Sequence, residues 1–177
     1  MMNNKTRYVV QAGLIAAIYI IATYISAAFG LAYGGIQFRI SEMLTILPVF
    51  TNAAIPGLAV GCFLSNLASP LGAIDWVCGT LATLIGAIGT KMVKDIKFRG
   101  IPFLSPLMPV ITNTIIIGLL LVFTSEEGAT LMLFITMGLG IFVSELVCCY
   151  LGLPLFILIS IVIPLIALKA GNNIGMN

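Results

Sequence analysis

The stretch "GGIQFRISEMLTILP", residues 34–48, places polar side chains between two apolar segments. Within six residues it carries Gln37, Arg39, Ser41 and Glu42. Of the chain's 177 residues, 60% are hydrophobic and only 8% are charged, which excludes an ordinary soluble domain. The apolar runs recur along the whole chain, so neither a signal peptide nor a single anchor explains them. The composition therefore predicts an all-α integral membrane protein.

Several classes of chemistry are disfavoured by what the sequence lacks. It contains no histidine, the side chain that most often serves as general base and as metal ligand. No phosphate-loop or G-x-S-x-G signature is present, so we expect no catalytic residue, no metal site and no cofactor in this chain. Cys62, Cys78, Cys148 and Cys149 lie in apolar segments without C-x-x-C spacing, which is typical of buried small hydrophobes. A net charge of +2 is too small to indicate nucleic acid.

The apolar regions predict the spans. The first has 21 residues, which reach roughly 32 Å as a helix and are enough to cross a bilayer core. The second is interrupted by two prolines, and three further spans follow it. In chain order the five regions are residues 8–28, 43–68, 76–93, 107–123 and 130–151. Residues 152–168 are also apolar, and they either prolong the last helix, lie in the interface or re-enter the membrane.

Basic residues predict the orientation. Lys5 and Arg7 precede the first helix, and the loop of residues 91–104 is basic, so both should be cytoplasmic. Residues 39–69 must then cross inward and return. As helix they give about 46 Å, against about 60 Å for two full crossings. The sequence thus predicts a compact bundle of six transmembrane helices, the second and third short, with both termini cytoplasmic. Residues 29–41 form an outer loop, and the acidic residues 126 and 127 also lie outside. The turn near "FTNAAIPG" should lie below the membrane surface, where something else must cover it.

Four ionisable residues, Arg39, Glu42, Asp75 and Glu145, lie within or beside the apolar segments, and their presence at membrane depth needs a reason. Each costs a few kcal/mol on insertion scales, so such residues mark ligand sites or pathways. Their formal charges sum to −2, which favours a cation or a ligand rich in N–H donors. Amides and one tryptophan lie in or beside the same segments. The predicted substrate-binding residues are Gln37, Arg39, Glu42, Asn66, Asp75, Trp76, Asn113 and Glu145.

Simpler interpretations exist for most of these residues. Arg39 and Glu42 are three apart and can pair at a helix start, with Ser41 as N-cap. Asp75 can be an N-cap, and Trp76 an interfacial belt residue. Glu145 has the weakest alternative, because no basic residue is near it in sequence.

Small residues on the first helix form a stripe. Ala12 with Ala16, and Gly13 with Ala17, are small-x-x-x-small pairs that let another helix approach closely. The stripe indicates either packing inside the bundle or docking on a partner subunit.

Three stretches, "IQFRISEMLTILP", "AIPGLAVGCFLSNLASPLGAIDWVCGTLATLIGA" and "SELVCCYLGLPL", resemble the QueT-type queuosine-precursor transporters. These are substrate-binding S components of energy-coupling factor (ECF) transporters, and the resemblance covers residues 8–155. It implies a multi-pass protein of a prokaryotic plasma membrane that captures 7-aminomethyl-7-deazaguanine from outside. It also implies a transmembrane scaffold and two ATPases as partners, which hydrolyse the ATP. Ala12, Gly13, Ala16 and Ala17 match the docking surface for that scaffold.

The resemblance also suggests roles within the site. Glu145 would read the guanine-like edge, while Glu42 or Asp75 would hold the ammonium group. Gln37 and the two asparagines would complete the hydrogen bonds, and Arg39 would bind the ring carbonyl or fix Glu42. The alternatives are an S component for another vitamin or purine-like base, and a stand-alone proton-coupled transporter. The chain departs from the family pattern in the apolar run that follows "LGLPL".

Overall fold

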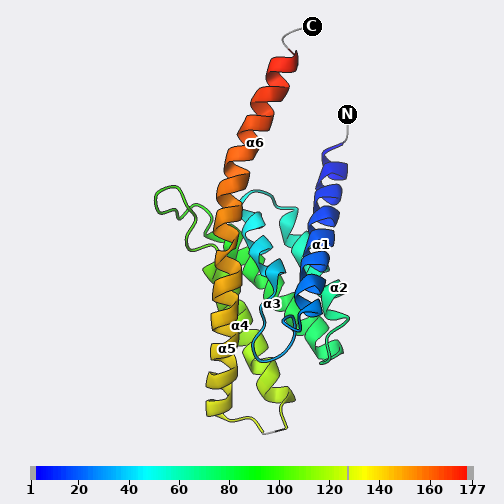
Figure 1. Cartoon of the computed structure of the whole chain (residues 1–177), viewed down its shortest axis with the longest axis vertical. Helices are drawn as coiled ribbons and strands as arrows, with labels where there is room; N and C mark the ends of the chain where they lie inside the picture. The colour runs from blue at the N-terminus through cyan, green and yellow to red at the C-terminus, as the bar shows by residue number, and fades with distance from the viewer. Residues whose placement is uncertain (1–2, 127, 175–177) are drawn as a thin grey trace.

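The structure, a computed structural model, describes residues 3–126 and 128–174. Residues 1–2, Glu127 and residues 175–177 lie outside this part. Figure 1 shows an array of helices along one long axis. They are α1 (Asn4–Ala28), the 3₁₀ helix η1 (Ile40–Val49), α2 (Ala54–Asn66), α3 (Ala73–Met92), α4 (Leu107–Thr124), α5 (Leu131–Tyr150) and α6 (Gly152–Ile174).

The predicted fold class is confirmed. In the described part, α1, α3, α4 and the run Leu131–Leu165 are long and apolar enough to cross a membrane. The two remaining apolar helices, η1 and α2, are short. Counting the run through α5 and α6 as one helix gives six, of which the second and third are the short ones.

The helix η1 is unusual because it is a 3₁₀ helix of ten residues, whereas such runs rarely exceed three or four residues. A rise of about 2 Å per residue lets it reach about 20 Å, where an α-helix of the same length reaches about 15 Å. The 13 residues of α2 also reach about 20 Å. Each short helix is thus shorter than a bilayer core of about 30 Å.

The turn between the two short helices is covered from two sides. From α1, the Tyr8 hydroxyl donates to the Asn52 carbonyl at 3.4 Å, and Thr51 Oγ1 donates to Gln11 Oε1 at 3.3 Å. From α6, the Phe156 ring stacks on Phe50 with 5.0 Å between centroids. The two hydrogen bonds satisfy polar groups of the turn and the ring stack adds an apolar contact, while Asn52 itself stays exposed.

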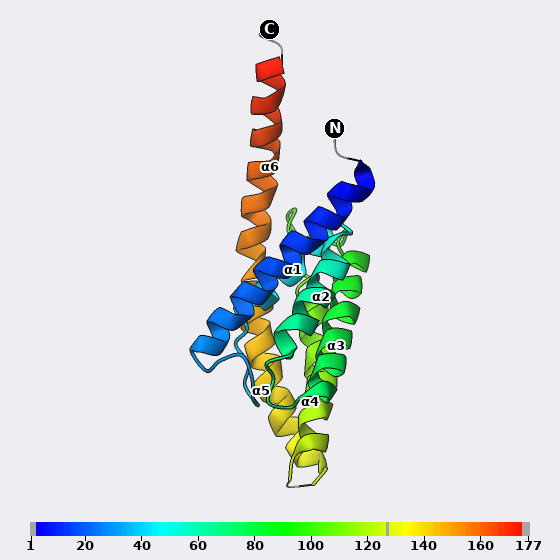
Figure 2. The same ribbon diagram turned by 90° about the vertical axis from the view of Figure 1, so that its right-hand side faces the viewer.

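The helices α1 and α2 pack at backbone distance, and α1 crosses obliquely over α2 (Figure 2). A Cβ atom at Gly57 would lie 2.7 Å from the Ala12 carbonyl oxygen. One at Gly61 would lie 2.9 Å from the Cβ of Tyr19. Two glycines four residues apart therefore make room for the small residues of α1.

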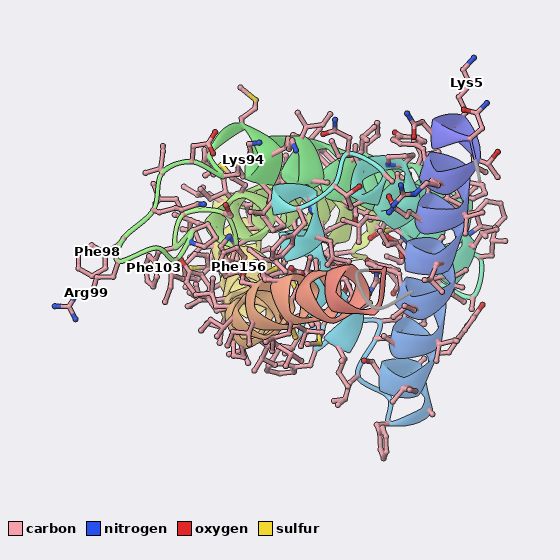
Figure 3. All side chains as sticks on the ribbon, turned by 90° about the horizontal axis from the view of Figure 1, so that it is seen from above. Lys5, Lys94, Phe98, Arg99, Phe103 and Phe156 are labelled. Atoms are coloured by element: carbon pink, nitrogen blue, oxygen red, sulfur yellow. The ribbon has the colours of Figure 1, made fainter. Side chains whose placement is uncertain are left out.

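The last helix prolongs α5, with only Leu151 between them. Figure 1 shows α6 running on almost in line with α5 and projecting past the rest of the bundle. The start of α1 and the end of α6 lie at the same end of the molecule, opposite the link from α4 to α5. Seen from that end, Lys5 and Arg99 point outward (Figure 3). Which end faces the cytoplasm stays a prediction.

Candidate functional site

The segment between α1 and η1 is pinned to two helices. The Tyr33 hydroxyl donates to the Ser65 carbonyl of α2 at 2.7 Å, and burial raises the pKa of Tyr33, so this donor stays protonated. The Gln37 backbone N–H donates to Ser144 Oγ of α5 at 3.3 Å. The Arg39 guanidinium lies over the Tyr33 ring, 5.2 Å from its centroid. These contacts carry Arg39 into the bundle, where it is only 5% exposed.

Arg39 belongs to a first polar cluster with Asn66 and Asp75. Its Nε donates to the Ala32 carbonyl at 2.7 Å and its Nη1 to Asn66 Oδ1 at 3.0 Å. Its Nη2 lies 4.0 Å from Asp75 Oδ2. Asn66 Nδ2 in turn donates to the Asp75 carbonyl at 3.2 Å. The link between α1 and η1, α2 and α3 thus meet at one buried ion pair.

This cluster corrects two of the simpler interpretations. Arg39 pairs with Asp75 on α3 and not with Glu42, and η1 is capped at Arg39 without any side-chain hydrogen bond from Ser41. Asp75 lies within the first turn of α3, whose N-cap is Gly72. Gly72 has a φ of 67°, a left-handed conformation that favours glycine, which explains why no capping side chain is found there.

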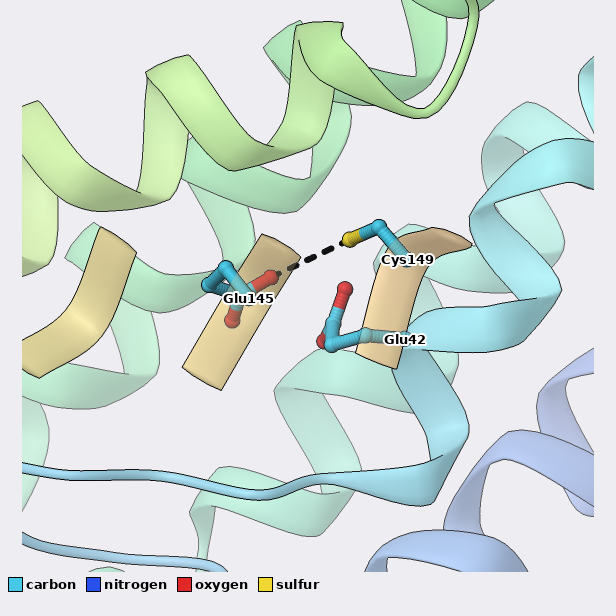
Figure 4. Close-up of side chains that lie close together, drawn as sticks. All are labelled: Glu42, Glu145 and Cys149. Atoms are coloured by element: carbon cyan, nitrogen blue, oxygen red, sulfur yellow. Dashed lines mark hydrogen bonds between the residues drawn. The ribbon is translucent and has the colours of Figure 1, made fainter. Parts of the chain in front are cut away.

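A second cluster brings together two carboxylates and a thiol. One atom each of Glu42, Glu145 and Cys149 lie within 4.8 Å of one another, and all three side chains are buried. Glu42 comes from η1, and the other two come from α5 (Figure 4). Cys149 Sγ donates to Glu145 Oε2 at 3.3 Å, and Asn113 of α4 lies against the same carboxylate. Tyr19 of α1 donates its hydroxyl to Glu42 Oε1.

The acceptors of this second cluster are not all satisfied. Glu42 Oε2 is buried and has no hydrogen-bond partner. Neither Glu42 nor Glu145 forms a salt bridge with any side chain that the structure describes. A buried acceptor without a partner costs about 1–3 kcal/mol, and more when it is charged. The cluster can bind a cationic group or N–H donors, and its donor set also suits a borderline metal such as zinc.

Two predicted site residues stay apart from these clusters. The Gln37 side chain donates to the Gly34 carbonyl at 2.9 Å and so closes its own loop. The Trp76 indole N–H is buried without a partner. Among the described residues, no side-chain hydrogen bond joins Gln37 or Trp76 to either cluster. Arg39, Glu42, Asn66, Asp75, Asn113 and Glu145 are the predicted residues that the fold brings into the two clusters.

Sequence reasoning missed a stripe of hydroxyl groups on α1. Tyr19 holds Glu42, Thr23 Oγ1 donates to Ser41 Oγ at 2.8 Å, and Ser26 Oγ accepts from the Ile40 N–H at 3.0 Å. The three residues follow i, i+4, i+7 spacing and thus share one helical face. This spacing is the feature of the sequence from which the shared polar face could have been predicted. Cys149 was also missed as a site residue, although it stands four residues after Glu145 on the same face.

The small-residue stripe on α1 divides into two faces. Ala16 is buried and, with Ala12, lies against Gly57 and Gly61 of α2, so this half packs inside the bundle. Gly13 and Ala17 are exposed. A groove of about 210 Å³ runs where the two faces meet. Its lining residues are Val9, Ala12, Gly13, Ala16, Pro56, Gly57 and Val60.

Comparison with known proteins gives one family and one relative. The family model of the QueT transporter matches residues 9–161. The protein "Queuosine precursor transporter QueT" of Lactococcus lactis subsp. cremoris (strain MG1363) is 36% identical over 85 residues, which are 48% of this chain and 50% of the relative. The chain thus spans about half the length of the curated relative it matches. No solved structure matches.

Proposed function

Because this chain belongs to the QueT transporter family, we propose that it captures a queuosine precursor, 7-aminomethyl-7-deazaguanine, within the membrane. Membership of a transporter family separates the chain from enzymes, and its several apolar helices make it a multi-pass membrane protein. In this proposal the chain is the S component of an ECF transporter. A transmembrane scaffold and two ATPases supply the ATP-driven step, for which this sequence has no phosphate loop.

The observation that carries the proposal is the pair of carboxylates formed by Glu42 and Glu145. The Arg39 charge is matched by Asp75, so a formal charge of −2 belongs to two groups without a basic partner among the described residues. The proposed ligand offers what this pair lacks. It carries an aminomethyl group that is cationic at neutral pH, and ring N–H and NH₂ donors that one carboxylate accepts together.

The geometry also narrows the proposed roles. Asp75 already faces Arg39, whereas Glu42 Oε2 has no partner, so Glu42 is the better acceptor for the ammonium group. Glu145 then reads the guanine-like edge, with Asn113 beside it to complete the hydrogen bonds. For Trp76, which stays apart from both clusters, the support is the buried indole N–H without a partner, a donor that a ligand can use. Gln37 and Asn66 belong to the wall of the site, where they hold the outer loop and Arg39.

The scaffold subunit is proposed to dock on the exposed half of the α1 stripe. Gly13 and Ala17 face outward, and the groove beside them exposes part of Ala12 and Ala16. A helix of the scaffold can approach such a surface closely, because no side chain rises from Gly13. The bilayer surrounds the remaining apolar faces.

The test is binding of 7-aminomethyl-7-deazaguanine to the purified chain in detergent. Calorimetry gives the affinity, and the fluorescence of Trp76, the only tryptophan, reports the site. We expect saturable binding that guanine competes for poorly, because guanine lacks the ammonium group. Absence of binding by folded protein would overturn this cargo and favour another vitamin or base. Uptake by the lone chain in proteoliposomes under a proton gradient would overturn its role as an S component.

A further inference from the structure

We propose that Tyr19 and Cys149 are positioning residues of the ligand site. Each donates a hydrogen bond to one oxygen of a buried carboxylate and thereby directs the other oxygen towards the ligand. Tyr19 does this for Glu42 and Cys149 for Glu145. The inference deepens the proposed function and rests on it, because it assumes that these two carboxylates receive the donors of a cationic heterocycle.

The contact between Tyr19 and Glu42 is the stronger of the two. Tyr19 is 0% exposed, and its hydroxyl reaches from α1 to Glu42 Oε1 on η1. The second oxygen of the same carboxylate is buried and unpartnered. A carboxylate can turn about its terminal bond, and a donor held on a second helix fixes the plane of the group. Figure 4 shows one oxygen of Glu42 directed towards Glu145 and Cys149.

The rest of the interface between α1 and η1 keeps this donor in register. One turn further along α1, Thr23 donates to Ser41 at 2.8 Å. A further turn along, Ser26 accepts from the Ile40 N–H at 3.0 Å. Because Ser41 immediately precedes Glu42, these two bonds determine where the Glu42 backbone lies relative to Tyr19. A phenylalanine would fill the same volume at position 19, so the hydroxyl group itself needs a reason, and Glu42 supplies it.

Cys149 orients the Glu145 carboxylate in the same way, through a hydrogen bond to one of its oxygens. The two residues are four apart on α5, and the thiol donates to Oε2 at 3.3 Å. A thiol is a weak donor, so it orients the carboxylate without satisfying it and leaves its acceptor strength for a ligand. The neighbouring Cys148 is also buried at 3% exposure, but the described residues include no hydrogen bond from its thiol to either carboxylate. Cys148 is therefore a control of the same chemistry.

The experiment compares two ligands across four variants. 7-Aminomethyl-7-deazaguanine carries the ammonium group, and 7-deazaguanine lacks it but keeps the guanine-like edge. The test variants are Tyr19→Phe and Cys149→Ala. The matched controls are Tyr24→Phe, which alters an exposed tyrosine of the same helix, and Cys148→Ala. Calorimetry gives both dissociation constants for each variant, and thermal unfolding shows that each is folded.

We expect Tyr19→Phe to raise the dissociation constant of the cationic ligand about tenfold and to change that of 7-deazaguanine by less than about twofold, since only the cationic ligand uses Glu42. Cys149→Ala should raise the dissociation constants of both ligands by a similar factor of about three, because both present the edge that Glu145 reads. The two controls should change neither constant. If Tyr19→Phe weakens both ligands equally while lowering the unfolding temperature, its role is structural and the inference is overturned.

A second measurement needs no ligand. Infrared difference spectra of the purified protein should show a shifted carboxyl band in Tyr19→Phe and none in Tyr24→Phe. An unchanged band in Tyr19→Phe would overturn the positioning role, whatever the cargo is. If the wild-type chain binds neither ligand, the proposed function falls and the positioning role falls with it. If the wild type binds both but the ratio of the two constants is unchanged in Tyr19→Phe, only the positioning role falls.

Discussion

Arg39 Nη2 and Asp75 Oδ2 lie 4.0 Å apart inside the bundle, where the link between α1 and η1 meets α3. The same guanidinium donates to Asn66 on α2 and to the Ala32 carbonyl. One basic side chain therefore joins three parts of the fold and neutralises one of the three buried acids. The acidic character of the site depends on the two that remain, Glu42 and Glu145.

Asp75→Asn should lower the free energy of unfolding by about 3 kcal/mol, because it leaves the buried Arg39 charge without its opposite. Thermal or denaturant unfolding in detergent measures this. Asp95→Asn is the control, since Asp95 is exposed and outside the bundle. Adding Arg39→Gln to Asp75→Asn should recover part of the loss if the two residues are coupled. Equal stability of Asp75→Asn and the wild type would contradict the importance of this pair.

Glu145→Gln should weaken binding of 7-aminomethyl-7-deazaguanine by at least tenfold, because it replaces a charged acceptor with an amide of nearly the same shape. Isothermal titration calorimetry provides the affinity. The exposed Glu126, changed to glutamine, is the control for altered net charge. A loss of less than about twofold would remove Glu145 from the ligand site.

Glu42→Gln should discriminate between ligands. It should raise the dissociation constant of the cationic ligand at least tenfold and that of 7-deazaguanine much less, since only the ammonium group needs the second negative charge. The ratio of the two dissociation constants is the measured quantity. Similar losses for both ligands would mean that Glu42 contacts the ring edge or acts through packing.

Gly57→Ala should destabilise the chain by about 1–3 kcal/mol, the usual cost of overpacking. The added Cβ would stand 2.7 Å from a backbone oxygen of α1, which cannot turn away as a side chain does. Gly13→Ala is the matched control, because nothing lies within 4 Å of its Cβ position, and alanine there should stabilise the helix by roughly 0.5–1 kcal/mol. Unfolding temperatures that change equally would contradict close packing of the two helices.

Gly13→Leu tests the exposed half of the stripe. It should reduce co-purification with the scaffold subunit while leaving the ligand dissociation constant of the isolated chain unchanged, because it adds bulk only to the outward face. Ala129→Leu, at the exposed link between α4 and α5, controls for added apolar surface. Unimpaired assembly of Gly13→Leu would place the docking surface elsewhere.

Much of the fold follows from hydropathy and charge. The long apolar runs predict the spans, and the two basic segments require two helices between residues 39 and 69, too few residues for full crossings. Both short helices are present. The cost of placing charge in lipid also explains why Arg39, Glu42, Asp75 and Glu145 all lie inside the bundle.

The remaining details depend on contacts between helices far apart in sequence. Ten residues do not distinguish a period of 3.0 from one of 3.6, so the 3₁₀ form of η1 could not be read from its pattern. Arg39 has acidic candidates at positions 42 and 75, and only the packing of α3 selects the second. Tyr19 and Cys149 look like ordinary members of apolar helices until a carboxylate faces them. The inward half of the α1 stripe depends on two glycines of α2.

The continuity of α5 and α6 has a mechanical consequence. The run Leu131–Leu165 has 35 residues, which reach about 52 Å, while the hydrocarbon core of a bilayer is about 30 Å thick. Even the steepest tilt common among membrane helices, about 40°, leaves about 40 Å along the membrane normal. A span of this length is accommodated by a kink in the helix, by local thickening of the bilayer or by a partner that covers its apolar end, so its fit depends on the thickness of the membrane.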